Sequence, residues 1–303
     1  MGNVAVGYDV LGSALNCIGD RVTVRRLDEP VVRVGGITGC VTDLPTTPTD
    51  NTATVALLDL METRDLDFGF EVSLEKGIPL GSGLGGSAAS AVGAVVAAAE
   101  LMPMSLSNDE LLPHALAGEA VASGAVHPDN VAPCLYGGLV LTREVDPPDV
   151  VSIPVPDRIR CVLVRPDRMI ETRDARACLP ESLPLTDSVK QTAHLGAFVA
   201  GCYRNDLELI GRALRDLIVE PHRASLVPGF ADVQSAAMEH GALGCSLSGA
   251  GPTVFAWCDG AVEAERVEEA MTAAFAEHDV PTEAWVSTIP KEGARVVEPA
   301  PAA

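Results

Sequence analysis

The sequence predicts an α+β protein built from two domains, at residues 1–150 and 151–303. Short apolar or alternating segments, typical of strands, are mixed with helical patterns and lack the regular strand–helix alternation of a doubly wound sheet. A glycine-rich turn at 78–86 runs directly into an apolar helical segment. A proline-rich stretch at 146–156 is the best candidate for the boundary between the domains.

The individual elements follow from the same patterns. In the first half we expect strands at 22–25, 68–74 and 139–142, and helices at 87–101 and 107–124. In the second half we expect helices at 188–203, 207–219, 230–240 and 262–277, paired strands around a glycine turn within 243–258, and a last strand near Trp285. A capping box formed by Ser107 and Glu110 marks the start of the second helix.

The chain is strongly acidic, because its formal net charge is −21 and only three of its 21 basic residues are lysines. Such a surface repels nucleic acids and anionic membranes, so neither is expected as a partner. High charge with little lysine also keeps proteins dissolved in a salt-rich cytosol, which gives the hypothesis of a halophilic archaeal source. An anionic ligand such as ATP would need local donors or a metal ion in this field.

The eight cysteines occur singly, without a C-x-x-C pair or a histidine at ligand spacing. This argues against a zinc site and against a disulfide framework. The longest apolar run, residues 88–99, is too short to span a bilayer. Since the sequence opens on a glycine-rich segment without a signal peptide, we expect a cytoplasmic protein.

The most informative segment is residues 78–89, which read IPLGSGLGGSAA. Its glycines let the backbone turn tightly and bring N–H groups close to a ligand. The helix that follows offers further N–H groups and the positive end of its dipole, an arrangement that suits a phosphate. We therefore predict a phosphate-binding loop.

Three other interpretations of this loop are weaker. A Walker-type P-loop requires a lysine followed by serine or threonine, and the chain has Gly86-Ser87-Ala88 there. A dinucleotide-binding fingerprint is matched by Gly81, Gly83 and Gly86, but no second strand ending in an acidic residue follows. A glycine turn that merely begins a helix is the third.

Glu119 has an unusual position in the helix at 107–124. Leu112, Leu116 and Glu119 lie on one row of that helix, which is its apolar face. A buried carboxylate is costly unless it is paired or bound to a metal. A salt-bridged or snorkelling glutamate is the alternative.

Residues 79–89 resemble the phosphate loop of the GHMP kinases, a family that includes galactokinase, homoserine kinase, mevalonate kinase and phosphomevalonate kinase. Residues 2–12, GNVAVGYDVLG, resemble the motif S-A-N-x-x-x-G-F-D-x-L-G, although a turn would also explain them. Residues 246–253, SLSGAGPT, resemble the C-terminal loop S-G-S-G-P-T-x-F-A, for which a glycine hairpin is the alternative. In the family this last loop lies against the phosphate loop.

The resemblance implies a GHMP kinase fold. Its N-terminal domain is like the second domain of ribosomal protein S5, with a left-handed βαβ crossover, and its C-terminal domain is ferredoxin-like. ATP and substrate bind between the two, and a homodimer is common among relatives. Related proteins have about a dozen more residues before the first motif, so we expect the natural start to lie upstream of Met1.

The resemblance also implies ATP and Mg²⁺ as cofactors. A carboxylate and a serine hydroxyl are hard donors that suit Mg²⁺, and the family's pattern puts Glu119 and Ser87 in that role. Asn51 stands where related kinases have an adenine-pocket asparagine, but a turn or a helix cap explains it equally well. The implied ATP-binding residues of the loop are Pro79, Leu80, Gly81, Ser82, Gly83, Leu84, Gly85, Gly86, Ser87, Ala88 and Ala89.

Residues 127–138, HPDNVAPCLYGG, resemble the H-x-D-N-V-A-P-x-x-x-G-G segment of the homoserine kinase branch, whereas mevalonate-type members carry G-x-D-N. Residues 172–176 resemble S-T-x-x-A-R, and residues 220–223 resemble E-P-x-R. The arginines of these two motifs, Arg176 and Arg223, are therefore implied to bind a substrate α-carboxylate through paired hydrogen bonds. The residues implied to contact amino and hydroxyl groups are Asn3, Asp9, His127, Asp129 and Asn130.

The implied reaction converts ATP and L-homoserine to ADP and O-phospho-L-homoserine, a step towards threonine. Catalysis would depend on Asp129, Glu119 and Ser87, with Asp129 either accepting the hydroxyl proton or only orienting the hydroxyl. Another kinase of the family, such as an archaeal shikimate or mevalonate kinase, is the first alternative. A nicotinamide-binding oxidoreductase and a non-catalytic relative are the others.

Overall fold

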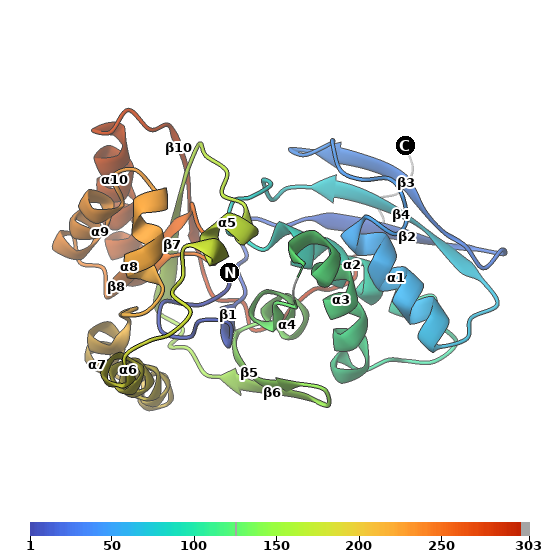
Figure 1. Ribbon diagram of the computed structural model, residues 1–303, viewed down its shortest axis with the longest axis horizontal. Coiled ribbons are helices and arrows are strands. Elements are labelled where there is room, and N and C mark those ends of the chain that lie inside the picture. Colours follow the sequence, from blue (N-terminus) through green and yellow to red (C-terminus); the bar gives the residue numbers. More distant parts are fainter. Residues whose placement is uncertain (125, 298–303) are drawn as a thin grey trace.

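The structure is a computed structural model that describes residues 1–124 and 126–297 (Figure 1). Its strands are β1 (Leu11–Ser13), β2 (Arg21–Leu27), β3 (Val32–Gly39), β4 (Gly69–Lys76), β5 (Leu139–Val145), β6 (Pro148–Ile153), β7 (Ile159–Pro166), β8 (Gly244–Leu247), β9 (Val254–Asp259) and β10 (Thr282–Ser287). Its helices are α1 (Thr52–Thr63), α2 (Gly86–Ala99), α3 (Asn108–Ser123), α4 (Pro128–Tyr136), α5 (Thr172–Ala177), α6 (Leu185–Arg204), α7 (Leu207–Ala213), α8 (Glu220–Arg223), the 3₁₀ helix η1 (Ala224–Leu226), α9 (Phe230–Glu239) and α10 (Ala261–Ala276).

The first half of the chain is built on the sheet β2-β4-β3, in which β2 and β4 are antiparallel and β3 and β4 are parallel. Alternate residues of β4, Phe70, Val72 and Leu74, are buried on the face that α1 and α2 cover, and α3 packs on these two helices (Figure 1). Helix α2 is buried on most of its surface, as its apolar sequence predicts. This packing holds the N-terminal end of α2 in a fixed place.

The proline-rich stretch at 146–156, which we expected to mark the boundary between the domains, contains a strand. Residues 148–153 form β6, which pairs antiparallel with β5 in the sheet β1-β5-β6. The reason is that apolar residues lie between the prolines, and Pro148 occupies the first position of the strand, where a missing N–H is tolerated. The boundary between the domains stays a prediction.

The second half is built on the antiparallel sheet β10-β7-β9-β8. When β7, β8, β9 and β10 are counted as strands 1 to 4, their order across the sheet is 4-1-3-2. Helices α9 and α10 pack against this sheet (Figure 1). A ferredoxin-like unit has this arrangement. The predicted α+β fold class is confirmed.

The first residues of the chain lie between the two halves (Figure 1). Val4 and Leu11 are fully buried in one hydrophobic cluster with Phe198 and Trp257 of the second half. The amino group of Met1 donates a hydrogen bond to the carbonyl oxygen of Ser13. The N-terminal segment is therefore part of the core that joins the halves.

One predicted helix is shorter than expected. The segment at 207–219 is helical only to Ala213, because the carboxylate of Asp216 accepts hydrogen bonds from the N–H groups of Ile218, Val219 and Glu220 at 2.8–3.0 Å. These bonds begin a separate short helix, α8. The break places Arg223 at the last position of α8.

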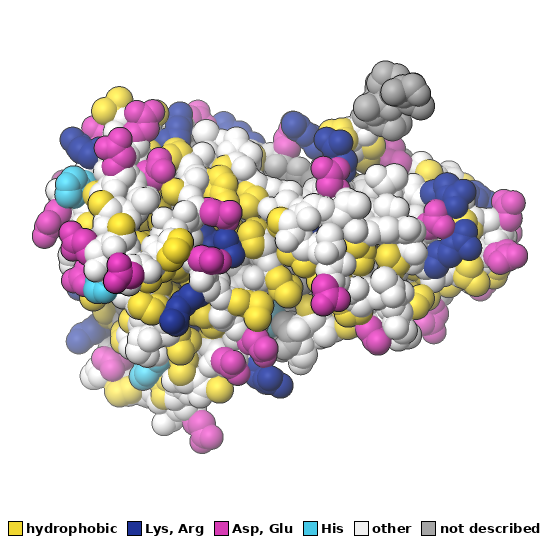
Figure 2. Space-filling model, turned by 90° about the horizontal axis from the view of Figure 1, so that it is seen from above, with side chains coloured by type: hydrophobic (Ala, Val, Ile, Leu, Met, Phe, Trp, Pro, Cys, Tyr) yellow, Lys and Arg dark blue, Asp and Glu magenta, His cyan; other side chains and the backbone are white. Residues whose placement is uncertain are grey.

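On the face drawn in Figure 2, acidic and basic side chains are interspersed over the surface. All eight cysteines are free thiols, and Cys161, Cys202, Cys245 and Cys258 are buried. Over residues 1–124 and 126–297, no helix combines the length and the apolar character needed to cross a membrane.

Candidate active site

A cleft of about 760 Å³ lies between the two halves of the chain. It is lined by the phosphate loop, the first motif, the start of α4, the α5 segment and Arg223. Most of the predicted site residues line it. They are Asn3, Asp9, Asn51, Pro79, Leu80, Gly81, Ser82, Gly83, Gly85, Gly86, Ser87, Glu119, His127, Asp129, Asn130, Arg176 and Arg223.

The phosphate loop is held against the C-terminal glycine loop. The hydroxyl of Ser248 donates to the carbonyl oxygen of Gly83 at 2.8 Å, and the hydroxyl of Thr253 donates to that of Ser82 at 2.7 Å. Gly83 has a φ of 79°, and a Cβ atom there would lie 2.4 Å from the Ser248 carbonyl oxygen. Only glycine fits this approach. The expected contact between the two loops is confirmed.

Three residues of the predicted ATP-binding loop are not among the residues that line the cleft. The side chains of Leu84 and Ala88 are buried in the hydrophobic core, and Ala89 packs against it. The N–H group of Ala89 donates to the carbonyl oxygen of Gly85 within the first turn of α2. The side chains of these residues therefore fix the loop to the core, because an apolar side chain gains more by burial than by contact with a phosphate. Any contact of their backbone with ATP stays a prediction.

Ser87 and Glu119 meet at the start of α2, as the resemblance implied. Glu119 is 4% exposed, and its carboxylate is hydrogen-bonded to the Ser87 hydroxyl. Burial, together with the nearby carboxylate of Asp129, raises the pKa of Glu119 from 4.5 to about 7, although Ser87 and Lys76 oppose the rise. A buried carboxylate and a hydroxyl beside a phosphate loop fit Mg²⁺ in donor type, because this ion takes oxygen ligands and keeps waters and phosphates as the rest.

Behind the loop lies an ion pair that the sequence analysis missed. Lys76, the last residue of β4, is 5% exposed and pairs with the fully buried carboxylate of Asp20. Its ammonium group also donates to the Gly86 carbonyl oxygen at 2.8 Å and to the Ser90 hydroxyl at 2.7 Å. Asp20 in turn accepts the N–H groups of Gly77 and Ile78. The pair thus fixes both ends of the loop to the sheet.

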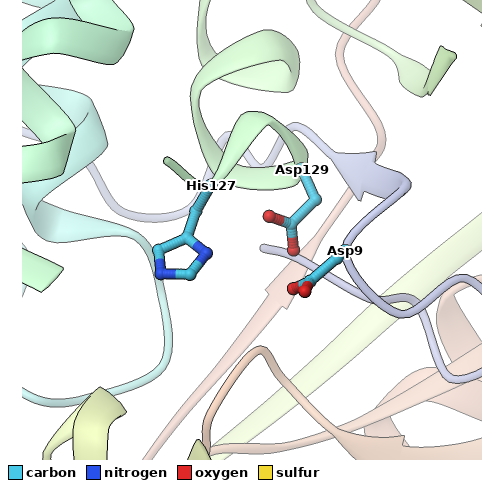
Figure 3. A group of neighbouring side chains, drawn as sticks. All are labelled: Asp9, His127 and Asp129. Carbon is cyan, nitrogen blue, oxygen red and sulfur yellow. The ribbon is translucent and has the colours of Figure 1, made fainter. Parts of the chain in front are cut away.

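Asp9, His127 and Asp129 come from two different elements and point toward one another (Figure 3). Asp129 stands in the first turn of α4 and is 2% exposed. Burial, reinforced by the Asp9 carboxylate, raises the pKa of Asp129 from 3.8 to about 6. Asp129 is therefore a stronger base than an ordinary aspartate.

His127 is neutral and offers a donor to the cleft. Burial and the charge of Arg176 lower its pKa. The Arg176 guanidinium donates to His127 Nδ1 at 2.8 Å, so the ring hydrogen sits on Nε2. Among the described residues, nothing accepts a hydrogen bond from the buried Nε2. A buried donor of this kind is costly unless a ligand pairs with it.

One potential metal-ligand atom from each of Asp9, His127 and Asp129 lies within 4.8 Å of the other two. By distance alone, these residues could form a second metal site. The position of Arg176 argues against a metal ion there, because its Nη2 atom is 2.7 Å from Asp9 Oδ1 and 2.8 Å from His127 Nδ1. A guanidinium already occupies the position that a cation would take. We therefore interpret this cluster as a polar substrate site.

The two arginines meet from different elements. Arg176 lies in α5, while the buried Arg223 ends α8 and donates to the carbonyl oxygens of Ala175 and Gly249 at 2.9 and 3.0 Å. The ring of Tyr8 lies against both guanidinium groups, 5.5 Å from Arg176 Cζ and 5.2 Å from Arg223 Cζ. Tyr8 was not singled out from the sequence, although its place inside the first motif was a signal.

Two predicted asparagines join the motifs to each other. The amide of Asn3 donates to the Gly249 carbonyl oxygen at 2.9 Å and accepts from the Asp9 N–H group at 3.1 Å. Asn130 lies against the phosphate loop, since a Cβ atom at Gly85 would be 3.1 Å from its Oδ1. The N-terminal ends of α2 and α4 therefore converge on one cleft, and both favour an anion.

Asn51 has a structural task in the cleft wall. Its side-chain oxygen accepts from the Ala53 N–H group at the start of α1, and its nitrogen donates to the Pro45 carbonyl oxygen. The helix-cap interpretation is thus correct. Any part of Asn51 in binding adenine stays a prediction. The cleft wall beside it is formed by Val41, Asp43, Leu44 and Pro45.

Comparisons with known proteins agree with this geometry. The family model described as GHMP kinases N terminal domain matches residues 51–138, and the model for the GHMP kinases C terminal domain matches residues 198–277. The fold and the site together are those of a GHMP kinase.

Comparison with individual proteins narrows the assignment within this family. The chain is 47% identical over 296 residues to the homoserine kinase of Xanthomonas campestris pv. campestris, covering 97% of this chain and 91% of that protein. It is 44% identical to the homoserine kinase of Chlorobium phaeobacteroides, with 98% and 97% covered. A crystal structure of homoserine kinase from Cytophaga hutchinsonii matches with a TM-score of 0.94 at 44% identity, covering 97% of this chain and 94% of that one. The chain belongs to the homoserine kinases of the GHMP kinase family.

Proposed function

We propose that the protein phosphorylates the side-chain hydroxyl of L-homoserine with ATP, giving ADP and O-phospho-L-homoserine. One observation carries the proposal: the phosphate loop and the arginines Arg176 and Arg223 open into the same cleft, with Asp129 also lining it. The three homoserine kinases described above support the choice of substrate. The product would serve threonine biosynthesis.

The nucleotide would lie along the phosphate loop. The N–H groups of the loop and the N-terminal end of α2 would bind the β- and γ-phosphates. Because Ser248 and Thr253 already hold the loop in shape, little reorganisation is needed when the nucleotide binds. The lining residues Val41, Leu44 and Pro45 offer apolar surface to the base, and Asp43 lines the cleft beside them.

The donor set of Ser87 and Glu119 would hold the Mg²⁺ of MgATP. When bound, the ion would neutralise charge on the phosphates as the phosphoryl group is transferred. Glu119 would then be ionised, because a divalent cation next to a carboxylate favours its charged form. The Ser87 hydroxyl would then give up its hydrogen bond to Glu119 and bind the ion instead.

The amino acid would occupy the opposite end of the cleft. Arg176 and Arg223 would bind its α-carboxylate, while Asp9 would face the amino group and His127 Nε2 would donate to an oxygen of the ligand. The hydroxyl oxygen forms a bond to the γ-phosphorus as the bond from that phosphorus to the β–γ bridging oxygen breaks. Asp129, with its pKa raised to about 6 by burial, accepts the hydroxyl proton.

The test is the release of ADP from MgATP with L-homoserine, L-serine, shikimate and mevalonate in parallel. Turnover with homoserine well above the other three supports the proposal. Preferred turnover of shikimate or mevalonate would replace the substrate but keep the kinase reaction. Absence of turnover with all four, for a protein that binds MgATP, would indicate a non-catalytic relative.

Three finer predictions accompany the proposal. An ATP-dependent reaction needs a compartment that supplies ATP, which favours the cytoplasm. A homodimer would be tested by the mass in solution. A salt-rich source would be tested by activity, since full activity in low salt would contradict it.

A further inference from the structure

Tyr8 connects the two arginines of the cleft. Its ring centroid is 5.2 Å from Arg223 Cζ and 5.5 Å from Arg176 Cζ, within the range of attractive cation–π contacts. The two guanidinium groups carry the same charge and repel each other, although the Asp9 carboxylate is paired with Arg176. A ring that attracts both can hold them together before a substrate arrives.

The hydroxyl group of Tyr8 is available as a donor. The Arg223 guanidinium engages the hydroxyl oxygen, while the Arg223 Nε and Nη1 atoms donate to backbone carbonyls. A phenol whose oxygen accepts a hydrogen bond can still donate its own hydrogen. Burial raises the pKa of Tyr8, so the hydroxyl keeps that hydrogen at neutral pH.

Arg176 adds a second available donor beside the ring. Its Nη2 atom is used by Asp9 and His127, but its Nε atom is buried and has no hydrogen-bond partner within the described chain. A carboxylate can accept several hydrogen bonds at once. The Tyr8 hydroxyl and Arg176 Nε therefore form, with Arg223, a positively charged set of donors suited to one carboxylate group.

We propose that Tyr8 is a specificity-determining residue for the substrate's α-carboxylate. Its ring positions Arg176 and Arg223, and its hydroxyl donates a hydrogen bond to the carboxylate. The family motif has phenylalanine at this position, so the motif implies a ring but not the hydroxyl. The inference rests on the proposed function, in which the substrate is an α-amino acid.

The experiment separates the ring from the hydroxyl and the carboxylate from the rest of the substrate. Wild type, Tyr8→Phe and Tyr8→Leu are compared with L-homoserine and with 3-aminopropan-1-ol, the same alcohol without a carboxylate, used as substrate or competitive inhibitor. We expect Tyr8→Phe to raise the KM for homoserine about 3- to 10-fold, the usual effect of one lost hydrogen bond. Tyr8→Leu should raise it about 30-fold or more, because both cation–π contacts are lost as well.

Two readouts and a pair of control variants distinguish this role from a merely structural one. The KM for MgATP should stay within about twofold of wild type for both variants, since the hydrogen bonds that hold the phosphate loop come from Lys76, Ser248 and Thr253 and not from Tyr8. Binding of 3-aminopropan-1-ol should be unchanged by Tyr8→Phe. Tyr203→Phe and Tyr203→Leu on α6 serve as matched controls, since Tyr203 is exposed and lies outside the cleft lining.

The outcomes are separable. An unchanged KM for homoserine in Tyr8→Phe, or an equal loss with homoserine and with 3-aminopropan-1-ol, overturns the role of the hydroxyl. An unchanged KM in a folded Tyr8→Leu overturns the role of the ring. If Tyr8→Leu does not fold, the comparison between wild type and Tyr8→Phe decides. Failure of the proposed function is a different result, because wild type itself would then not phosphorylate homoserine.

Discussion

The hydroxyl of Ser248 donates a hydrogen bond of 2.8 Å to the carbonyl oxygen of Gly83, although 165 residues separate the two in the chain. Thr253 makes a second bond of the same kind to Ser82. The phosphate loop therefore gets its shape from both halves of the protein. Its N–H groups are held in one arrangement by contacts that a local glycine turn could not supply.

Ser248→Ala should weaken the binding of MgATP. The variant leaves the half-buried carbonyl of Gly83 without its hydroxyl donor, a loss of about 0.5–1.5 kcal/mol in such cases. We expect the KM for MgATP to rise about fivefold while the KM for homoserine changes little. Ser235→Ala, at an exposed serine on α9, is the control. Equal effects on both KM values would show that the contact supports the whole cleft instead.

Glu119→Gln should lower kcat and the affinity for Mg²⁺ together. The substitution keeps the shape of the side chain but removes the charge that the ion needs, so we expect a loss in kcat of at least about 100-fold. The measurement is steady-state turnover over a range of Mg²⁺ concentrations. Glu110→Gln on the same helix, where the carboxylate caps α3 near the surface, is the control. Wild-type dependence on Mg²⁺ would remove Glu119 from the metal site.

The same variant should change how stability depends on pH. Burial raises the folded-state pKa of Glu119 from 4.5 to about 7, so between these values the folded protein holds a proton that the unfolded chain has lost. The stability of the metal-free protein should therefore fall as pH rises through this window. Urea unfolding at pH 5 and pH 8 should show a smaller decrease for Glu119→Gln than for wild type. An equal decrease in both proteins would mean that Glu119 is already ionised at pH 5.

Local signals in the sequence predicted their elements well. The capping box of Ser107 and Glu110 begins α3 as expected, because both partners lie within one turn. The row of Leu112, Leu116 and Glu119 is buried, so the helical spacing also identified the unusual carboxylate. Motifs likewise identified most of the cleft, since each carries its own glycines, acids or arginines.

The contacts between distant segments could not be predicted from these signals. Lys76 pairs with Asp20 across 56 residues, and nothing in the periodicity of β4 distinguishes a buried lysine at its end from an exposed one. The end of α7 was missed because Asp216 begins a new helix, a choice made by side-chain hydrogen bonds and not by helix propensity. Such features depend on the tertiary structure.

Asp129→Asn should abolish most of the activity. In wild type, the protonation of Asp129 should cause the loss of activity at acid pH. Because burial raises its pKa to about 6, the carboxylate becomes protonated and unable to accept the hydroxyl proton as pH falls through 6. We expect kcat/KM for homoserine at saturating MgATP to fall below that pH, and Asp129→Asn to lose about 100-fold or more. Asp28→Asn, at an exposed position, is the control. Near wild-type turnover of Asp129→Asn would leave Asp129 no part in the proton transfer.

Lys76→Met should destabilise the whole fold. Removing one partner of a buried ion pair leaves the Asp20 charge uncompensated, which costs about 3–5 kcal/mol. The Gly86 carbonyl oxygen and the Ser90 hydroxyl lose a partner as well. Urea unfolding measures the loss, and Arg25→Met is the matched control, because its ion pair with Glu71 is exposed and should matter little. A different result would be wild-type stability of Lys76→Met together with lost binding of MgATP. The Lys76 ammonium group would then bind the nucleotide, with the phosphates replacing Asp20 as its partner.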